Sequence, residues 1–68
     1  MIAPGTYAVV GEARCWSRFT LYPDGRVEFI DAIDGHRSYW GTKSTKGAAW
    51  LADVEEQLGR GELRKEGP

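Results

Sequence analysis

The sequence predicts an α+β domain, an antiparallel three- or four-stranded β-meander with one C-terminal α-helix packed on one face. Four β-prone segments separated by glycine-containing turns predict the meander. The segment that follows them repeats apolar side chains at helical spacing and predicts the helix. We therefore expect residues 1–59 to form a single domain and residues 60–68 to form a flexible charged tail.

The first strand is predicted over residues 6–10, a short segment closed by Gly11, and its partner in the sheet is left open. Residues 14–22 and 26–32 are the predicted second and third strands, joined by a Pro-Asp-Gly turn. Pro23 presets φ for the first corner of a type I turn, and Gly25 accepts the left-handed conformation that follows. This turn sets the register of the hairpin.

Successive side chains of a strand point to opposite faces of the sheet, so the register assigns each side chain to a face. On the core face the expected pairs are Leu21 with Val27 and Phe19 with Phe29. On the outer face they are Thr20 with Glu28, Arg18 with Ile30, and Trp16 with Ala32.

An Asp-Gly pair at residues 34–35 suits a two-residue type I′ turn and predicts a fourth strand over residues 36–42. The expected core-side pairs are Phe29 with Trp40 and Val27 with Thr42, and Asp31 lies opposite Ser38 on that side. The expected outer pairs are Ile30 with Tyr39 and Ala32 with Arg37.

The helix is predicted over residues 46–58, with Ser44 or Thr45 as its N-cap and Gly59 as a left-handed C-terminal residue. Its apolar stripe, expected to cover the core face of the sheet, consists of Trp50, Leu51, Val54 and Leu58. Gly47 lowers helix propensity, and a close approach of the helix to a strand would explain its presence.

Composition excludes several classes of protein. With 41% hydrophobic and 28% charged residues, the chain is neither a disordered tail nor a membrane span, and no membrane partner is expected. The N-terminus has no signal-peptide pattern, so a cytoplasmic location is expected. One cysteine, Cys15, and one histidine, His36, leave no recognisable zinc set, and we expect no metal and no cofactor.

We expect no enzymatic activity. His36 is the only imidazole and lies beside a turn, and nearby Asp34 and Ser38 do not make a catalytic triad without directed hydrogen bonds and an oxyanion site. Glu28 and Asp31 point to opposite faces of the sheet and cannot form an acid/base pair. Binding is the function class that remains.

The candidate binding site is the outer face of the sheet. Arginine beside tryptophan or tyrosine suits guanidinium–π packing, phosphate contacts and bidentate bonds to guanine. An exposed apolar patch on a small protein usually meets a partner, although the first strand, the tail or a second subunit are alternative covers for this face. The expected site residues are Arg14, Trp16, Arg18, Glu28, Ile30, Arg37, Tyr39 and Lys43.

Several of these residues carry a family resemblance. Trp16-Ser17-Arg18, Glu28 and residues 37–42, followed by a helix with Ala48-Ala49, resemble the DNA-binding domains of plant ethylene-response factors and the arm-site-binding domains of tyrosine recombinases. Those domains read DNA with arginine and tryptophan on an open sheet face. Over residues 14–58 the resemblance implies base or phosphate contacts for Arg14, Trp16, Arg18, Glu28, Arg37 and Tyr39. The chain departs from that family in lacking a basic N-terminal run.

A second resemblance covers residues 27–60. Val27-Glu28-Phe29, Asp34-Gly35 and residues 44–51 resemble the hairpin-plus-helix dimerisation domain of actinobacterial H-NS-like nucleoid-bridging proteins. In that family the module pairs subunits and leaves DNA binding to another domain. The resemblance implies self-association or binding to such a protein.

The sequence favours a small non-enzymatic accessory protein that binds DNA through the outer face of its sheet. A net charge of −1 excludes a general nucleic-acid coat. The alternative is a protein-interaction or homodimerisation module, such as a small regulator or inhibitor, anchored at the same face by Trp16, Ile30 and Tyr39. Specific DNA readers bury about 600–1,000 Å² per module, so a DNA-binding domain of this size is expected to dimerise.

Overall fold

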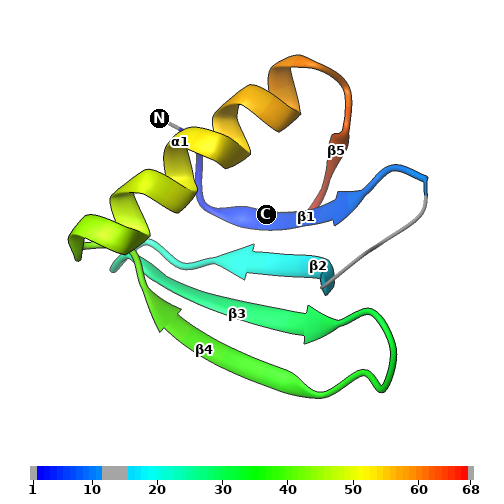
Figure 1. Cartoon of the computed structure of the whole chain (residues 1–68), viewed down its shortest axis with the longest axis horizontal. Coiled ribbons are helices and arrows are strands. Elements are labelled where there is room, and N and C mark those ends of the chain that lie inside the picture. Colours follow the sequence, from blue (N-terminus) through cyan, green and yellow to red (C-terminus); the bar gives the residue numbers. More distant parts are fainter. Residues whose placement is uncertain (1, 12–15, 68) are drawn as a thin grey trace.

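The computed structural model describes residues 2–11 and 16–67, which form one open antiparallel sheet with one helix packed against it (Figure 1). The elements are β1 (Gly5–Val9), β2 (Trp16–Leu21), β3 (Arg26–Asp31), β4 (Arg37–Gly41), α1 (Thr45–Gly59) and β5 (Leu63–Gly67). The order across the sheet is β4-β3-β2-β1-β5, so β4 and β5 form its two edges. The predicted α+β class is confirmed, and the sheet has five strands.

The C-terminal segment contains a strand where the sequence predicts a flexible tail. β5 pairs with β1, which lies between β2 and β5 and thereby gains a partner on both sides. Leu63 is 5% exposed and packs in the core, and Val10 N–H donates to Glu62 O at 2.9 Å. Backbone pairing with β1 and the burial of Leu63 outweigh the charged composition of this segment.

The β2–β3 hairpin has the predicted register from Leu21↔Val27 to Arg18↔Ile30, with Gly25 left-handed at φ 93°. Beyond Arg18 the prediction is wrong. The register shifts between Trp16 and Arg18, and Trp16 pairs with Asp31 instead of Ala32. An extra residue in one strand reverses the alternation of faces, so Trp16 lies on the helix side of the sheet.

The β3–β4 register differs from the predicted one by two residues. The observed pairs are Val27↔Trp40, Glu28↔Tyr39, Phe29↔Ser38 and Ile30↔Arg37. The carboxylates of Asp31 and Asp34 accept backbone N–H groups inside the connection, at 2.7 Å from Ile33 and 2.8 Å from His36. These bonds stabilise a longer loop than the predicted type I′ turn. Because the shift is even, every β4 side chain keeps its predicted face.

The helix begins and ends through local hydrogen bonds. Ser44, one of the two predicted candidates, is the N-cap, and its Oγ accepts the Gly47 N–H at 3.0 Å. At the C-terminus the left-handed residue is Gly61, at φ 78°, and not Gly59 as predicted. The buried core between the helix and the sheet, to which α1 contributes Val54, consists of Ile2, Tyr7, Phe19, Leu21, Val27, Val54 and Leu63.

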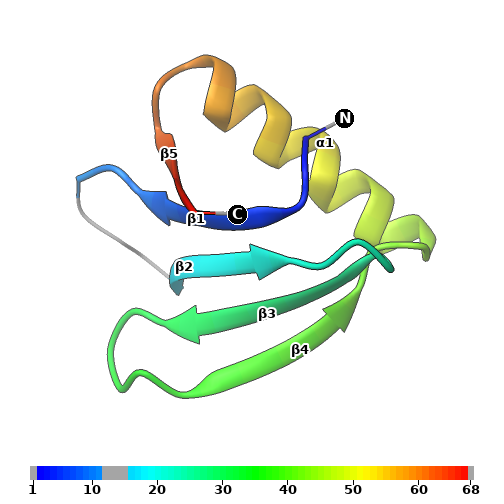
Figure 2. The same ribbon diagram turned by 180° about the vertical axis from the view of Figure 1, so that it is seen from behind.

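Gly47 permits the close approach that the sequence predicts. A Cβ at this position would lie 2.5 Å from Thr42 Cα and nearer still to the Gly41 carbonyl oxygen. Thr42 is itself fixed to the β2–β3 turn, because its N–H and its hydroxyl both donate to Gly25 O. The start of α1 is therefore held against the end of β4. From that point the helix runs toward β5 and away from β3 and β4 in both views (Figures 1 and 2).

Gly47→Ala should destabilise the fold, because the backbone atoms that the new methyl group meets cannot move aside as a side chain can. Overpacking of this kind costs about 1–3 kcal/mol or more and exceeds the gain of about 1 kcal/mol in helix propensity. The melting temperature, followed by circular dichroism, should fall by about 4–8 °C for each kcal/mol lost. The matched control is Gly59→Ala, where a Cβ meets no atom within 4 Å. Equal melting temperatures for the two variants would contradict this account.

Candidate functional site

The sheet face opposite α1, here called the outer face, carries no helix in the described part of the chain. Its side chains follow from the strand registers, with the arginines facing acidic neighbours. Across the sheet from β4 to β5 they are Tyr39, Arg37, Arg26, Glu28, Ile30, Thr20, Arg18, Thr6, Ala8, Arg64 and Glu66. Five residues of the predicted site lie together here, namely Arg18, Glu28, Ile30, Arg37 and Tyr39.

Carboxylates accompany the arginines of the outer face. Arg18 lies 3.0 Å from Glu66, which also pairs with Arg64 at 3.2 Å. Arg37 lies 3.4 Å from Glu28. Arg26, at the end of the same face, pairs with Asp24 at 2.9 Å, and all four arginine side chains are about half exposed or more. Ion pairs of this kind contribute only about 0–1 kcal/mol. These ion pairs therefore orient the arginine side chains but bind them too weakly to keep them from another anion.

A tyrosine hydroxyl sits in the same network. Tyr39 donates its hydroxyl hydrogen to Glu28 Oε2 at 2.6 Å. This bond, aided by Arg37, holds the pKa of Glu28 below its usual range. The same bond and the charge of Glu28 raise the pKa of Tyr39.

The other predicted site residues lie elsewhere. Trp16 is on the helix side of the sheet, so its predicted outer position is wrong. Lys43 is exposed in the connection between β4 and α1. Arg14 lies outside the described residues. The described aromatic side chains of the outer face are thus two tyrosines, Tyr39 and Tyr22, and Tyr22 lies beside Glu28 with Arg26 over its ring.

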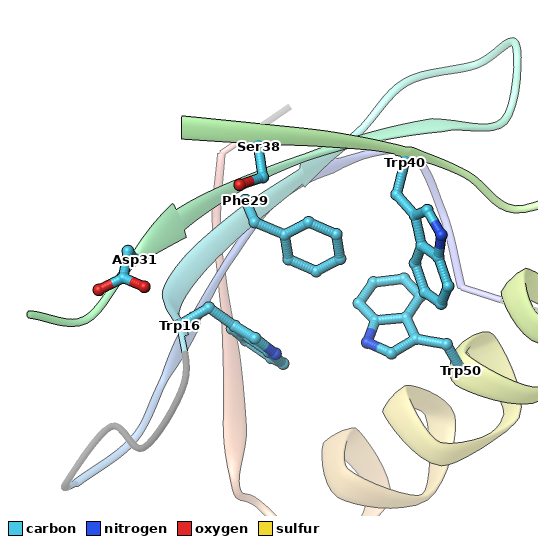
Figure 3. A pocket seen from close by; sticks show the side chains of 6 residues that line it. All are labelled: Trp16, Phe29, Asp31, Ser38, Trp40 and Trp50. Atoms are coloured by element: carbon cyan, nitrogen blue, oxygen red, sulfur yellow. The ribbon is translucent and has the colours of Figure 1, made fainter. Parts of the chain in front are cut away.

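An aromatic pocket of about 350 Å³ opens on the helix side of the sheet, where α1 diverges from β3 and β4 (Figure 3). Its lining residues are Trp16 of β2, Phe29 and Asp31 of β3, Ser38 and Trp40 of β4, and Trp50 of α1. The four rings point toward one another in Figure 3, with Asp31 and Ser38 on the sheet side. No local pattern in the sequence predicts this pocket.

Trp50 stands at the centre of the aromatic pocket. Its ring meets Phe29, Trp40 and Trp16 edge-on, at centroid distances of 5.2, 5.9 and 6.4 Å. Edge-to-face contacts are a favoured geometry for aromatic pairs. Trp40 remains 37% exposed and forms the open rim. The four aromatic rings thus form a large apolar surface, one side of which is accessible to solvent.

Asp31 gives the aromatic pocket one charged end. Its Oδ1 accepts the N–H groups of Ile33 at 2.7 Å and Asp34 at 3.3 Å. These backbone bonds hold the pKa of Asp31 below its usual range, so the carboxylate is ionised at neutral pH. A hydrogen-bond donor that enters the pocket would find an acceptor at this end.

β4 combines one wall of the aromatic pocket with an open sheet edge, since all five of its residues are exposed. Two backbone bonds, Asp31 N–H to His36 O and Thr42 N–H to Gly25 O, are both 2.9 Å long. They direct the peptide groups of even-numbered β4 residues toward β3. The N–H and C=O groups of Arg37, Tyr39 and Gly41 consequently point away from the sheet.

The edge formed by β5 is protected against pairing with another strand, unlike the β4 edge. β5 exposes Arg64, Lys65 and Glu66, and its register with β1 is irregular. Charged side chains and bulges are the usual devices that prevent an edge from pairing. β4 has a regular register with β3, and exposes Tyr39 at 63%. The β5 edge is thus protected against pairing with another strand, whereas the β4 edge is open to it.

Among the described residues, no three histidine, cysteine, aspartate or glutamate side chains are grouped so as to hold a metal ion. The helix found in residues 16–67 is also too short and too polar to cross a membrane.

Glu28→Gln should lower the pKa of Tyr39 toward its ordinary value, because the amide removes the negative charge that opposes the tyrosinate. The titration is followed by NMR of ¹³C-labelled tyrosine. Tyr7, whose pKa is raised by burial, serves as the internal control and should titrate as in the original protein. An unchanged Tyr39 titration would show that the bond to Glu28 does not set this pKa.

Comparison of the chain with protein-family models, with curated proteins and with solved structures finds no match. The two family resemblances of the sequence therefore stay predictions.

Proposed function

We propose that this chain is a small non-enzymatic protein-interaction module that binds an extended protein segment along β4 and seats one large side chain of that segment in the aromatic pocket. The observation that carries this proposal is that β4 is both the open edge of the sheet and one wall of the pocket. The surface differs from the one that the sequence favours, which is the outer face alone.

Strand addition explains how such a segment would be held. The outward N–H and C=O groups of Arg37, Tyr39 and Gly41 would pair with the backbone of the incoming strand. Its side chains would alternate between the two faces, and those on the helix side would meet the aromatic pocket. Backbone pairing supplies affinity in this mode, and the pocket supplies specificity.

The aromatic pocket suits a single side chain better than a large ligand. Its volume of about 350 Å³ lies near the lower end of the range of about 300–1,000 Å³ for small-molecule sites. Tryptophan and tyrosine are the residues that most often anchor protein interfaces. A pocket with aromatic walls and one carboxylate at its end therefore fits a large apolar side chain that also carries a hydrogen-bond donor.

The proposal is tested by removing one edge donor. A phage-displayed library of random short peptides is selected on the immobilised protein, and a selected peptide is titrated by tryptophan fluorescence. Tyr39→Pro removes an outward N–H that the fold does not use, and one backbone bond contributes about 0.5–1.5 kcal/mol, which is about a two- to tenfold loss of affinity.

The control is Tyr39→Thr, which removes the same ring and keeps the N–H. It should bind the peptide more tightly than Tyr39→Pro does. Equal affinities for these two variants, or a selection that yields no binding peptide, would contradict strand addition at β4.

DNA binding through the outer face is the second candidate. The observation that favours it is that Arg18, Arg37 and Arg64 share one uncovered sheet face. Each would have to exchange a carboxylate for a phosphate, and the net charge of −1 adds no general attraction.

Arg18→Ala combined with Arg37→Ala should abolish any retention of a short DNA duplex in a low-salt gel-shift titration, with the melting temperature nearly unchanged. The control, Lys46→Ala with Arg60→Ala, removes the same charge from α1 and its C-terminal end. If both double variants lost DNA retention equally, binding would depend on total charge and not on the outer face. If the variant with Arg18→Ala and Arg37→Ala still retained DNA fully, this candidate function would be excluded.

A further inference from the structure

We infer that the segment bound at β4 is β4 of a second copy of this chain, so that two copies pair antiparallel and join their sheets. The inference rests on the proposed function and names its partner. A two-fold axis perpendicular to the sheet relates the copies, and both helices lie on the same side. The five strands of each copy then form one sheet of ten.

The peptide groups of β4 determine which registers are available. Only residues whose N–H and C=O point outward can bond across the new interface, so Arg37, Tyr39 and Gly41 must pair among themselves. The register centred on Tyr39 is the one that pairs all five residues of β4. It places each Tyr39 opposite Tyr39 of the second copy.

Side-chain sizes are complementary in this register. Ser38 lies opposite Trp40 of the second copy, and Arg37 lies opposite Gly41 of the second copy, so each long side chain meets a small one. A shift of two residues in one direction would oppose the two Trp40 side chains, and a shift in the other would oppose the two Ser38 side chains. Both alternatives pair fewer residues.

This register also fills the aromatic pocket. Ser38 lines the pocket, and directly opposed residues of paired strands point to the same face. Trp40 of the second copy therefore lies at the pocket's open rim, on the side of Phe29 and Asp31. Each copy thus completes the pocket of the other.

The charges permit this arrangement. The two Arg37 side chains are separated by four residues along the strands, or more than about 13 Å, so they do not oppose each other. Because the contact consists of one five-residue strand and the adjoining rim of the pocket, we expect it to bury less than the standard area of about 1,200–2,000 Å². This predicts a weak dimer whose population depends on concentration.

A cysteine at the two-fold axis tests the register. In a Cys15→Ser background, Tyr39→Cys places two thiols on Cα atoms about 5.5 Å apart, within the range that a disulfide bridges. Arg37→Cys is the matched control on the same strand and face, with its thiols too far apart to join. Under mild oxidation the Tyr39→Cys dimer should form at least about tenfold faster, because pairing raises the local thiol concentration.

Sedimentation velocity of the unmodified chain, from micromolar to millimolar protein, gives the second readout. The mass should rise from 7.6 kDa toward twice that value, and Tyr39→Pro should shift the transition to higher concentration. A chain that stays monomeric, or a dimer that cross-links equally well through Arg37→Cys, overturns the inference. Peptide binding to a monomeric chain in the preceding experiment would leave the proposed function standing, so the two failures are distinguishable.

Discussion

The backbone contact between Gly47 and the end of β4 determines the geometry of everything on the helix side. With the first turn of α1 pressed against Thr42, and Thr42 bonded to Gly25, the helix is pinned at one corner of the sheet. Its other end must reach β5 at the far edge, so it crosses the sheet obliquely. The wedge that this leaves over β3 and β4 is the space in which the aromatic pocket forms.

The irregular pairing in β2 decides which side chains occupy that wedge. By moving Trp16 to the helix side, it gathers all three tryptophans around Phe29 and leaves the outer face without a tryptophan among the described residues. The tryptophans and the arginines of the described strands are thereby separated onto different faces, where regular alternation would have mixed them. The protein accordingly presents two chemically distinct surfaces that meet at β4.

Local chemistry was sufficient to predict much of the fold, as the Pro-Asp-Gly turn, the Ser44 cap and the helical stripe show. β5 was missed because its pairing with β1 joins segments far apart in sequence, and a charged strand has no alternating apolar pattern. The register shift at Trp16 was not predicted, because a strand with one extra residue has the same β-prone composition as a regular strand. Alternation alone brought five outer-face residues together correctly. The aromatic pocket depends on the helix path, which no local pattern encodes.

The asymmetry between the two sheet edges limits how large an assembly of this chain can become. A sheet that is open on both sides can add copies without end, which is the route to a filament. Here the β5 side carries charges of both signs and an irregular register, so growth from that side is disfavoured. If two copies pair through β4 as proposed, the assembly would stop at two, because each copy would have used its open edge and covered its aromatic surface. In that assembly the residues that form the interface would also set its stoichiometry.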